Sequence, residues 1–226
     1  MRKLRVGFIV NPIAGMGGRV ALKGTDGVVD EAIRRGGARP VAPEVARLFL
    51  SELKHYKEAE SFEFLTGPGP LGGEDYLREF GFVFDVIRHR EIGYREIEGV
   101  KIPDTTSDDT KILAREMLEK VDIIVFAGGD GTARDVHSVL GKKVPILGVP
   151  TGVKMFSGVF AASPESAARV LVEFARGRAR LEERDVMDLD EDAYRRDEVR
   201  PKHYGKALTP VVELLVQGGK GAAESR

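Results

Sequence analysis

The segment Gly128–Thr132 (GGDGT) places one carboxylate, that of Asp130, among glycines and a threonine. Glycines let the backbone approach a phosphate closely, and the N–H groups at the start of a following helix favour the anion. A carboxylate repels phosphate, so Asp130 suits either a Mg²⁺ ion or the acceptance of a proton from an attacking hydroxyl. The alternative is a plain glycine-rich turn in which Asp130 is the N-cap of a helix. Phosphoryl transfer and a structural turn are therefore the two interpretations of this segment.

Two more glycine-rich segments lie at residues 11–18 (NPIAGMGG) and 148–158 (GVPTGVKMFSG). The first is neither a P-loop nor a complete GxGxxG motif. In the second, the Thr151 hydroxyl can donate to a phosphate and the Lys154 ammonium can neutralise one. A surface turn and a solvated lysine are the structural alternatives. Residues 105–110 (TTSDDT) add hydroxyls and carboxylates, and their simpler interpretation is the cap of a helix.

Composition excludes several other kinds of site and partner. The 226 residues include no cysteine, which excludes disulfides, cysteine-bound zinc and thiol catalysis. The four histidines are scattered without metal-ligand spacing, and no Ser-His-Asp triad is indicated. A net charge of −1 argues against nucleic acid as the main partner, and no apolar run approaches the length of a membrane span. We therefore expect a soluble, cytoplasmic protein that binds neither nucleic acid nor membrane.

Apolar runs and their periodicity predict an α/β fold in which strands alternate with helices. Strands are expected at residues 4–11, 62–65, 83–87, 122–127 and 145–149. Helices are expected at residues 28–35, 43–56, 74–80, 107–120, 133–140 and 164–176, whereas residues 88–103 are polar and irregular. Because the strands are continuously apolar, we expect a doubly wound, mostly parallel, Rossmann-like sheet over residues 1–180.

The order of these elements gives the three glycine-rich segments a common position. Each of them follows a strand, and loops at the carboxyl ends of parallel strands form a nucleotide crevice at a topological switch point. If the strands at residues 4–11 and 122–127 are near neighbours, the loops after them face each other. Thr106 with Asp109 resembles a capping box, and Ser163 is expected to open the helix at residues 164–176.

Residues 181–226 are expected to form a charged linker and a partial second domain or tail. Residues 208–216 (LTPVVELLV) form an apolar run that a complete second domain would cover. An uncovered apolar strand invites pairing with another chain, so we expect a homodimer or higher homo-oligomer with this run at or near the contact. In the alternative, the run folds back onto its own sheet and the chain stays a monomer.

Five segments occur in one order along the chain: NPIAGMGG, TTSDDT, VFAGGDGTARDV, GVPTGVKMFSGVFA and RDVMDLDEDAYR. Together they resemble the archaeal-type ATP-NAD kinase-like family, which is related to the acetoin-catabolism protein AcoX. The resemblance runs from Val6 to about Lys220. GGDGT alone indicates only the superfamily that NAD kinases share with the diacylglycerol and sphingosine lipid kinases.

The resemblance implies transfer of a phosphoryl group from ATP or polyphosphate, with Mg²⁺, to the adenosine ribose 2′-hydroxyl of NAD, which gives NADP. Asp130 then matches the catalytic aspartate and is also the candidate Mg²⁺ ligand. The phosphate-holding loop matches Gly128, Gly129, Gly131 and Thr132, and the first nucleotide loop matches Asn11, Gly15 and Gly17. Further candidate nucleotide-binding residues are Thr151 and Lys154, in a PTGVK segment where familiar NAD kinases have an Asn-containing turn.

Kinases that this sequence resembles continue into a second, mostly β domain, which supplies much of the NAD site, including an Asn-Glu pair. This sequence stops about where that domain should begin, so we expect the phosphate half of the site and little of the specificity half. A nucleotide-binding module without kinase activity is therefore the main alternative function. A relative of the lipid kinases is a further alternative, with a poorer match outside GGDGT.

Overall fold

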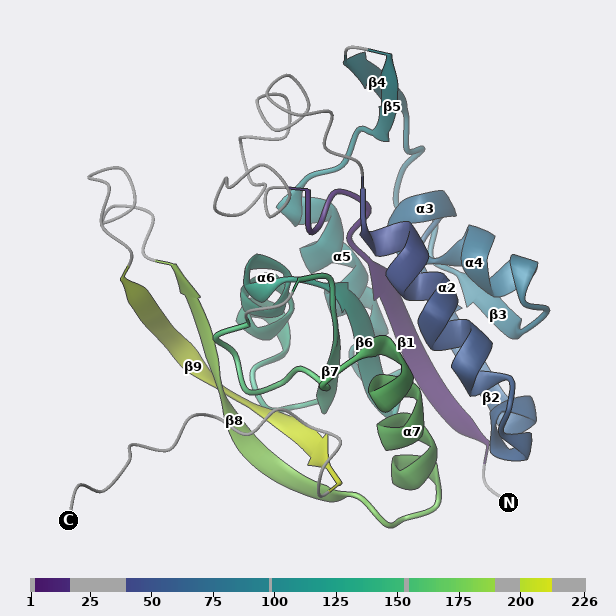
Figure 1. Cartoon of the computed structure of the whole chain (residues 1–226), viewed down its shortest axis with the longest axis vertical. Coiled ribbons are helices and arrows are strands. Elements are labelled where there is room, and N and C mark those ends of the chain that lie inside the picture. The colour runs from purple at the N-terminus through teal and green to yellow at the C-terminus, as the bar shows by residue number, and fades with distance from the viewer. Residues whose placement is uncertain (1–2, 17–39, 98, 153–154, 190–199, 213–226) are drawn as a thin grey trace.

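A five-stranded parallel sheet lies at the centre of the computed structural model, which describes residues 3–16, 40–97, 99–152, 155–189 and 200–212 (Figure 1). The strands are β1 (Leu4–Val10), β2 (Phe62–Thr66), β3 (Val83–Val86), β6 (Ile123–Gly128) and β7 (Ile146–Pro150). Their order is β3-β2-β1-β6-β7, and every neighbouring pair is parallel. Each of these strands begins and ends within one residue of the bounds that the apolar runs predict.

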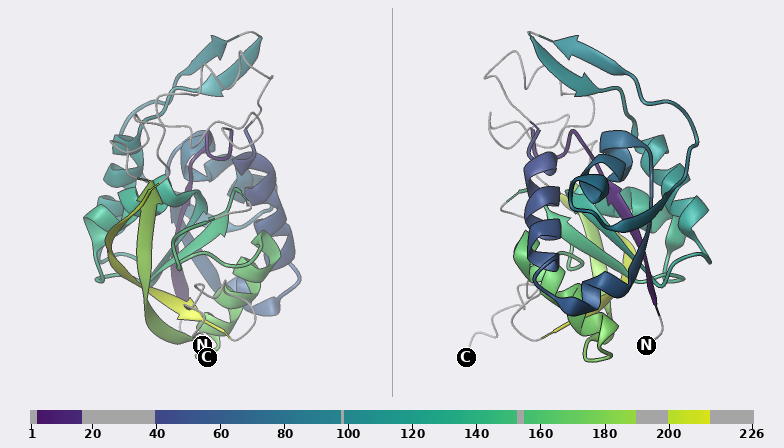
Figure 2. Two further views of the ribbon diagram at one scale, coloured as in Figure 1. Left: turned by 60° about the vertical axis from the view of Figure 1, so that its left-hand side comes forward. Right: turned by 90° about the vertical axis from the view of Figure 1, so that its right-hand side faces the viewer.

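Helices cover both faces of this sheet and make the fold a three-layer α/β/α arrangement. One face carries α2 (Ala42–Leu53), α4 (Glu74–Glu79) and α7 (Pro164–Ala175), and the other carries α5 (Ser107–Met117) and α6 (Asp130–Leu140). The right-hand view of Figure 2 shows α2 and α7 on one side of the sheet and α5 on the other. Two short helices flank β2, namely η2 (Lys57–Ser61) before it and α3 (Gly69–Gly72) after it. The prediction of a doubly wound, Rossmann-like sheet is confirmed.

Strands β1 and β6 are adjacent interior strands of the sheet and are buried on both faces, which explains their continuous apolar runs. Neighbouring residues of β1 point to opposite layers, so Phe8 packs beneath α2 and Ile9 packs beneath α5 and α6. The Phe8 ring stacks on that of Phe49 in α2, with 5.7 Å between the ring centroids. This packing fixes the carboxyl ends of β1 and β6 side by side.

The residues that were expected to start two helices do so. Thr106 and Asp109 form a capping box at the start of α5, with both reciprocal hydrogen bonds present. At the start of α7, Ser166 N donates a hydrogen bond to the Ser163 hydroxyl at 3.1 Å. The helix expected at residues 28–35 lies outside the described residues. Within the part of the chain that the structure describes, each helix is too short or too polar to cross a membrane.

Two antiparallel hairpins occur where the sequence predicted irregular or charged segments. The pair β4 (Tyr94–Ile97) and β5 (Val100–Pro103) lies in the stretch expected to be irregular. The pair β8 (Arg180–Leu189) and β9 (Pro201–Val211) begins in the charge-dense stretch after residue 179. Most residues of β8 are exposed or half-buried, so this strand has no apolar run. Backbone pairing does not depend on side-chain polarity, and the charged sequence therefore concealed a strand.

The β8–β9 hairpin packs against α6 and β7 of the parallel domain (Figure 1). Val186 of β8 and Ala207 of β9 are fully buried in the same apolar cluster as α5 and α6. The hairpin begins at Arg180, which is the boundary expected between the two parts of the chain. It extends the fold with antiparallel β structure, as the start of a second β domain would, and the division into two domains stays a prediction.

The expectation that nothing covers the apolar run is wrong for residues 208–212. Thr209 is fully buried and donates a hydrogen bond to Ile146 O of β7, and Val211 is only 9% exposed. The run pairs with β8 and packs on the chain's own sheet because its apolar side chains can be buried there without a second domain. Residues 213–216 lie outside the described residues.

The strand order reverses at β1, and this reversal determines where a ligand can bind. From β1 the chain builds outward through β2 and β3, and it then returns to the other side of β1 with β6 and β7. At such a switch point the loops after neighbouring strands separate and leave a crevice beyond their carboxyl ends. The three predicted glycine-rich loops follow β1, β6 and β7 and so begin at this one edge.

Candidate active site

The loop after β1 is hydrogen-bonded directly to the GGDGT segment after β6. Asn11 N donates to Ala127 O at 2.9 Å, which continues the parallel pairing for one more residue. The Asn11 amide Nδ2 donates to the Thr132 hydroxyl at 3.0 Å, and Thr132 is buried in the first turn of α6. The prediction that these two loops face each other is confirmed, because β1 and β6 are adjacent strands.

The third loop, after β7, is joined to the other two through Gly15 and Thr151. Gly15 has a φ of +82°, in the left-handed region that glycine tolerates best. A Cβ at this position would lie 2.6 Å from Thr151 O, so the backbones approach more closely than a side chain would allow. Thr151 is itself buried, and its N–H donates to Gly128 O at 3.2 Å. All three loops therefore meet at the carboxyl edge of β1, β6 and β7.

Asp130 occupies the first turn of α6, but its side chain does not cap that helix. Gly129 is the N-cap residue, and α6 begins at Asp130, three residues before the start that the sequence predicted. The two carboxylate oxygens of Asp130 accept hydrogen bonds from Phe156 N and Ser157 N, both at 2.9 Å. The interpretation of Asp130 as an N-cap is therefore wrong, and its carboxylate instead joins GGDGT to the loop after β7.

The surroundings of Asp130 favour its protonated form more than water would. Burial removes the carboxylate from solvent and raises the pKa of Asp130, and the amides of Phe156 and Ser157 offset this only in part. Within the described residues, the groups that act on the pKa of this carboxyl are Phe156 and Ser157. A carboxylate with a raised pKa is a suitable proton acceptor for a hydroxyl.

The glycines of GGDGT differ in what surrounds them. A Cβ on Gly128 would lie 2.6 Å from Cβ of Thr132, so glycine is needed there for the first turn of α6 to fold over the end of β6. A Cβ on Gly129 would meet no atom of the described residues within 4 Å, so none of these residues fills the space beside the N-terminus of α6. Gly131 lies within the first turn of α6. Gly129 is thus the position where a phosphate has room to approach the backbone.

Ser157, which the sequence alone did not indicate, anchors the loop after β7 that holds Asp130. The Ser157 hydroxyl donates to Met187 O at 2.8 Å and accepts from Met187 N at 3.0 Å, which ties the loop to β8. Its neighbour Phe156 is 46% exposed beside the carboxylate. Both residues lie in the segment GVPTGVKMFSGVFA, but backbone amides carry no side-chain signal that could have indicated their role.

Of the predicted site residues, Asn11, Gly15, Thr132, Asp130 and Thr151 converge together with the GGDGT glycines. Gly17 and Lys154 lie outside the described residues. Residues 6–179 match the family model described as the ATP-NAD kinase N-terminal domain. The chain belongs to this family.

Comparisons with curated proteins and with solved structures give no information beyond membership in the ATP-NAD kinase family. Among curated proteins, none matches the chain. Among solved structures, a protein of unknown function from Vibrio parahaemolyticus is similar over 66% of this chain and 85% of its own, with 14% identity and a TM-score of 0.28. A likeness of that degree carries no argument about fold or function. The narrower resemblance to the archaeal type and to AcoX stays a prediction.

The TTSDDT segment of this ATP-NAD kinase relative has a structural role. Asp109, whose side chain is 3% exposed, caps α5 and accepts hydrogen bonds from Arg90 Nε and Nη2, both at 2.6 Å. His89 Nε2 lies 2.8 Å from the same carboxylate. Burial acts to raise the pKa of Asp109, but these partners outweigh it and hold the pKa at about 2. The simpler interpretation of TTSDDT, a helix cap, is confirmed.

The residues at the loop convergence fit Mg²⁺ in one mode only. Within the described residues, no group of three histidine or carboxylate side chains is placed to hold a metal ion. Mg²⁺ is commonly bound through one or two carboxylates together with substrate phosphates and water. Asp130 would be the carboxylate in such an arrangement, with phosphate and water oxygens as the other ligands.

Proposed function

We propose that this chain is an NAD kinase-type phosphotransferase, which transfers a phosphoryl group from ATP or polyphosphate to the adenosine ribose 2′-hydroxyl of NAD and gives NADP. The observation that carries the proposal is the Asp130 carboxylate at the convergence of three glycine-rich loops. Its raised pKa suits a base. Membership in the ATP-NAD kinase family supports the same chemistry.

In the proposed step, the ribose 2′-oxygen forms a bond to the transferred phosphorus while the bond from that phosphorus to its bridging oxygen breaks. The leaving group, ADP or a shortened polyphosphate, takes the electron pair, and the hydroxyl proton passes to the Asp130 carboxylate. The helix N-terminus beside Gly129 and the backbone of the loop at Asn11 and Gly15 stabilise the phosphate charge. Mg²⁺, when bound, supplies further neutralisation of the phosphates.

The direct test is an assay with NAD, Mg²⁺ and either ATP or polyphosphate, in which NADP formation is measured. NADP should appear with the intact chain and should be absent when the 2′-hydroxyl of the acceptor is replaced by hydrogen. Product from the 2′-deoxy acceptor would contradict the assignment of the attacking hydroxyl. No product from any donor would contradict the kinase proposal as a whole.

A nucleotide-binding module without kinase activity is the second candidate. It is supported by the convergence of the three glycine-rich loops, which can hold phosphates whether or not a transfer step follows. The two candidates differ in one result, because the module binds a nucleotide with Mg²⁺ yet forms no NADP. Binding measured by calorimetry alongside the NADP assay therefore separates them.

We also propose a cytoplasmic location, division near residue 180 into two domains, and self-association as a homodimer or higher homo-oligomer through the tail. Since residues 208–212 are covered by the chain's own sheet, the contact would have to involve residues beyond them. Sedimentation of the full chain beside a version that ends at residue 212 tests this. If the two sediment alike, the tail is not the interface.

A further inference from the structure

The β8–β9 hairpin contacts both of the segments that hold Asp130. The backbone of Asp130 belongs to α6, whereas its carboxylate accepts hydrogen bonds from amides of the loop after β7. The hairpin packs against α6 and β7, and Figure 1 shows it beside α6. It is therefore placed to set the distance between the helix that carries Asp130 and the loop that binds the carboxylate.

On the loop side, residues 157–158 bind β8 as a short additional strand would. Gly158 N donates to Asp185 O at 2.9 Å. The Ser157 hydroxyl donates to Met187 O at 2.8 Å and accepts from Met187 N at 3.0 Å, so it takes the place of a backbone partner for Met187. Ser157 is only 3% exposed, and removal of its hydroxyl would leave two backbone groups of β8 without this partner.

On the helix side, the hairpin is joined to α6 by an ion pair, a ring contact and a close backbone approach. Arg134 Nη1 lies 2.9 Å from Asp188 Oδ2 of β8. The same guanidinium lies over the ring of Tyr204 in β9, 5.7 Å from the ring centroid. Gly205 has a φ of +135°, and a Cβ at this position would clash with the ring of His137 in α6. The hairpin and α6 are therefore closely fitted.

The pairing of β8 with β9 is irregular at the residue that binds Ser157. Val186 pairs with Gly205 and Met187 pairs with His203, so Tyr204 is the extra residue of a β-bulge. Bulges are frequent next to active sites, where they re-aim the residues around them. Here the bulge lies opposite Met187, whose backbone N and O both bind the Ser157 hydroxyl.

From these contacts we propose that Ser157 is a positioning residue, through which the β8–β9 hairpin holds the Asp130 carboxylate where it can accept the proton of the attacking hydroxyl. The inference rests on the proposed kinase function and adds an element on which turnover depends. The side chain of Ser157 binds the hairpin while its N–H binds Asp130, so one residue passes a shift of the hairpin to the carboxylate. A misplacement of about 1 Å, caused far from the chemistry, can lower turnover about 100-fold.

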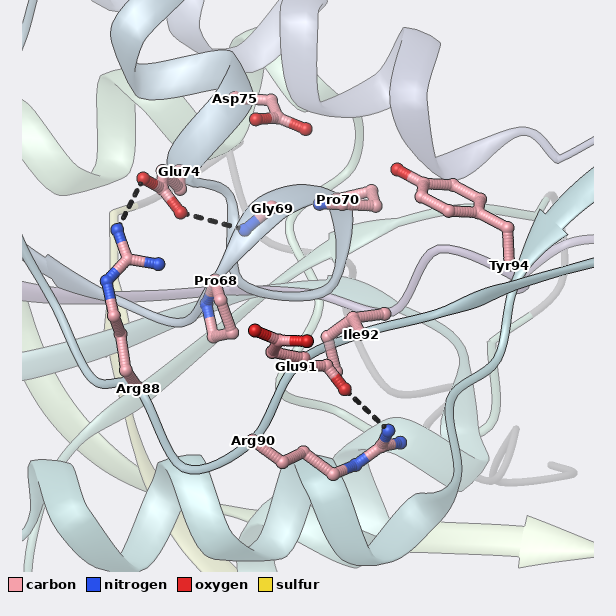
Figure 3. A pocket seen from close by; sticks show the side chains of 10 residues that line it. All are labelled: Pro68, Gly69, Pro70, Glu74, Asp75, Arg88, Arg90, Glu91, Ile92 and Tyr94. Atoms are coloured by element: carbon pink, nitrogen blue, oxygen red, sulfur yellow. Dashed lines mark hydrogen bonds and ion pairs between the residues drawn. The ribbon is translucent and has the colours of Figure 1, made fainter.

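The other side of the sheet provides a region for comparison. A cavity of about 600 Å³ lies beyond the carboxyl ends of β2 and β3, on the other side of β1 from Asp130 (Figure 3). None of the described residues that bind Asp130 or the hairpin lines this cavity. Tyr94 lies at its wall and is 51% exposed, so Tyr94→Ala removes an accessible side chain away from the hairpin.

The test measures kcat and KM for NADP formation by the full chain with Ser157→Ala. Because the altered side chain touches no substrate in the proposed step, kcat per folded molecule should fall about tenfold while KM for NAD and for the donor changes less than about twofold. Ser157→Thr keeps the hydroxyl and should hold kcat within about threefold of the parent.

Two controls accompany this substitution. Ser163→Ala also removes a hydroxyl that accepts a backbone N–H, at the start of α7, and is the matched control. It should lower the melting temperature but leave kcat within about twofold of the parent. Tyr94→Ala, at the cavity on the other side of β1, should likewise leave kcat unchanged.

Gly205→Ala tests the hairpin from the side that faces α6. Its new Cβ meets the His137 ring, so β9 must move away from α6 and kcat should fall about threefold or more with KM unchanged. Gly177→Ala also has a side chain at positive φ but meets no described atom within 4 Å, and it should leave kcat unchanged. If the hairpin acts through Ser157, Gly205→Ala should lower kcat less than about 1.5-fold when it is added to Ser157→Ala.

The outcomes separate this inference from the proposed function. If NADP is formed and Ser157→Ala has the parental kcat, or if Ser163→Ala lowers kcat equally, the positioning role is overturned and the kinase function stands. Fully additive losses in the double variant overturn the coupling through Ser157. Should Ser157→Ala fail to fold, Gly205→Ala beside Gly177→Ala decides in the same way.

Hydrogen exchange gives a result that does not depend on NADP formation. The amide of Phe156, which donates to Asp130, should exchange about tenfold faster in Ser157→Ala than in the parent or in Ser163→Ala. Unchanged exchange overturns the positioning role even where NADP is formed. If no donor yields NADP, the kinase function and the catalytic part of this inference both fail, and faster exchange would leave Ser157 with a structural role alone.

Discussion

Two aspartates at the same edge of the sheet, Asp109 buried and Asp130 half-buried, have opposite pKa shifts. Asp130 in α6 accepts two backbone amides, and burial keeps its pKa above the usual value. Asp109 in α5 accepts hydrogen bonds from the Arg90 guanidinium and the Thr106 amide, and its carboxylate contacts a ring nitrogen of His89. Its pKa is about 2. Burial acts in the same direction on both carboxyls, so the cationic partner of Asp109 makes the difference.

The difference indicates which carboxylate is available for chemistry. A carboxylate that is paired with a guanidinium has a low proton affinity and is therefore a poor base. Its ion pair stabilises the fold instead. A half-buried carboxylate whose donors among the described residues are neutral is less stable in its charged form, which is a cost that proteins bear at functional sites. This difference supports the proposal that Asp130 takes part in catalysis while Asp109 stabilises the fold, so substitutions at the two positions should have opposite consequences.

The largest effect is expected from Asp130→Asn on turnover. Removal of a positioned base typically lowers turnover about 10²- to 10⁴-fold, so NADP formation should fall at least ~100-fold. The free energy of unfolding should stay within about 1 kcal/mol of that of the parent chain. The relief of a buried charge and the loss of one amide acceptor act in opposite directions there.

Steady-state kinetics and chemical denaturation of the same preparations check both parts. Near-normal turnover in Asp130→Asn would show that another group accepts the proton. A large loss of unfolding free energy, with turnover reduced only in proportion to the folded fraction, would show that Asp130 has a structural role. Glu63→Gln, an exposed carboxylate on β2 that pairs with Lys3, is a suitable control for removal of a negative charge.

The converse is expected for Asp109→Asn, which should leave turnover per folded molecule within about twofold. Its free energy of unfolding should fall by roughly 2–3 kcal/mol, because the Arg90 charge loses its partner at a site that is largely buried. Arg90 is 40% exposed, which keeps the effect below that of a fully buried pair. In the double variant Asp109→Asn/Arg90→Met the loss should be smaller than the sum of the two single losses. Additive losses would show that the pair does not act as a unit.

The contrast between these aspartates could be predicted only in part from the sequence. The strand–glycine–helix order indicated Asp130, because continuous apolar runs such as that of β6 are legible without a structure. The partner of Asp109 could not be predicted, since Arg90 lies in a polar stretch whose fold depends on the packing of β3 and α5. The amides that hold Asp130 are invisible for another reason, because any residue type supplies a backbone N–H. The strand β8 was missed since its exposed side chains are free to be charged.

Acid titration of stability extends the comparison to pH. The folded pKa of Asp109 is about 2 against an ordinary value of 3.8, so its contribution is fully present above pH 3.8 and is lost as the pH falls toward 2. The shift corresponds to about 2 kcal/mol at neutral pH. Denaturant titrations between pH 2 and pH 6 should show this loss in the parent chain. Asp109→Asn should have a flatter profile over the same interval, and an equally steep profile would assign the acid sensitivity to other carboxylates.

The smallest effects are expected from glycine substitutions. These test whether nucleotide affinity at the loops around Asp130 depends on the geometry of the loops rather than on the stability of the fold alone. Gly15→Ala and Gly177→Ala both place a side chain at positive φ, with φ of +82° and +71°, and this strain alone should cost each about 1 kcal/mol of unfolding free energy. At Gly15 the new Cβ also meets the backbone, at 2.6 Å from Thr151 O, whereas at Gly177 it meets no described atom within 4 Å. Gly15→Ala should therefore separate the loops after β1 and β7 and weaken nucleotide binding several-fold, while Gly177→Ala leaves affinity unchanged. Calorimetry with adenosine diphosphate and thermal unfolding of both variants provide the measurement.

Equal affinities of the two variants for the nucleotide would mean that the close approach of Gly15 to Thr151 contributes to folding alone.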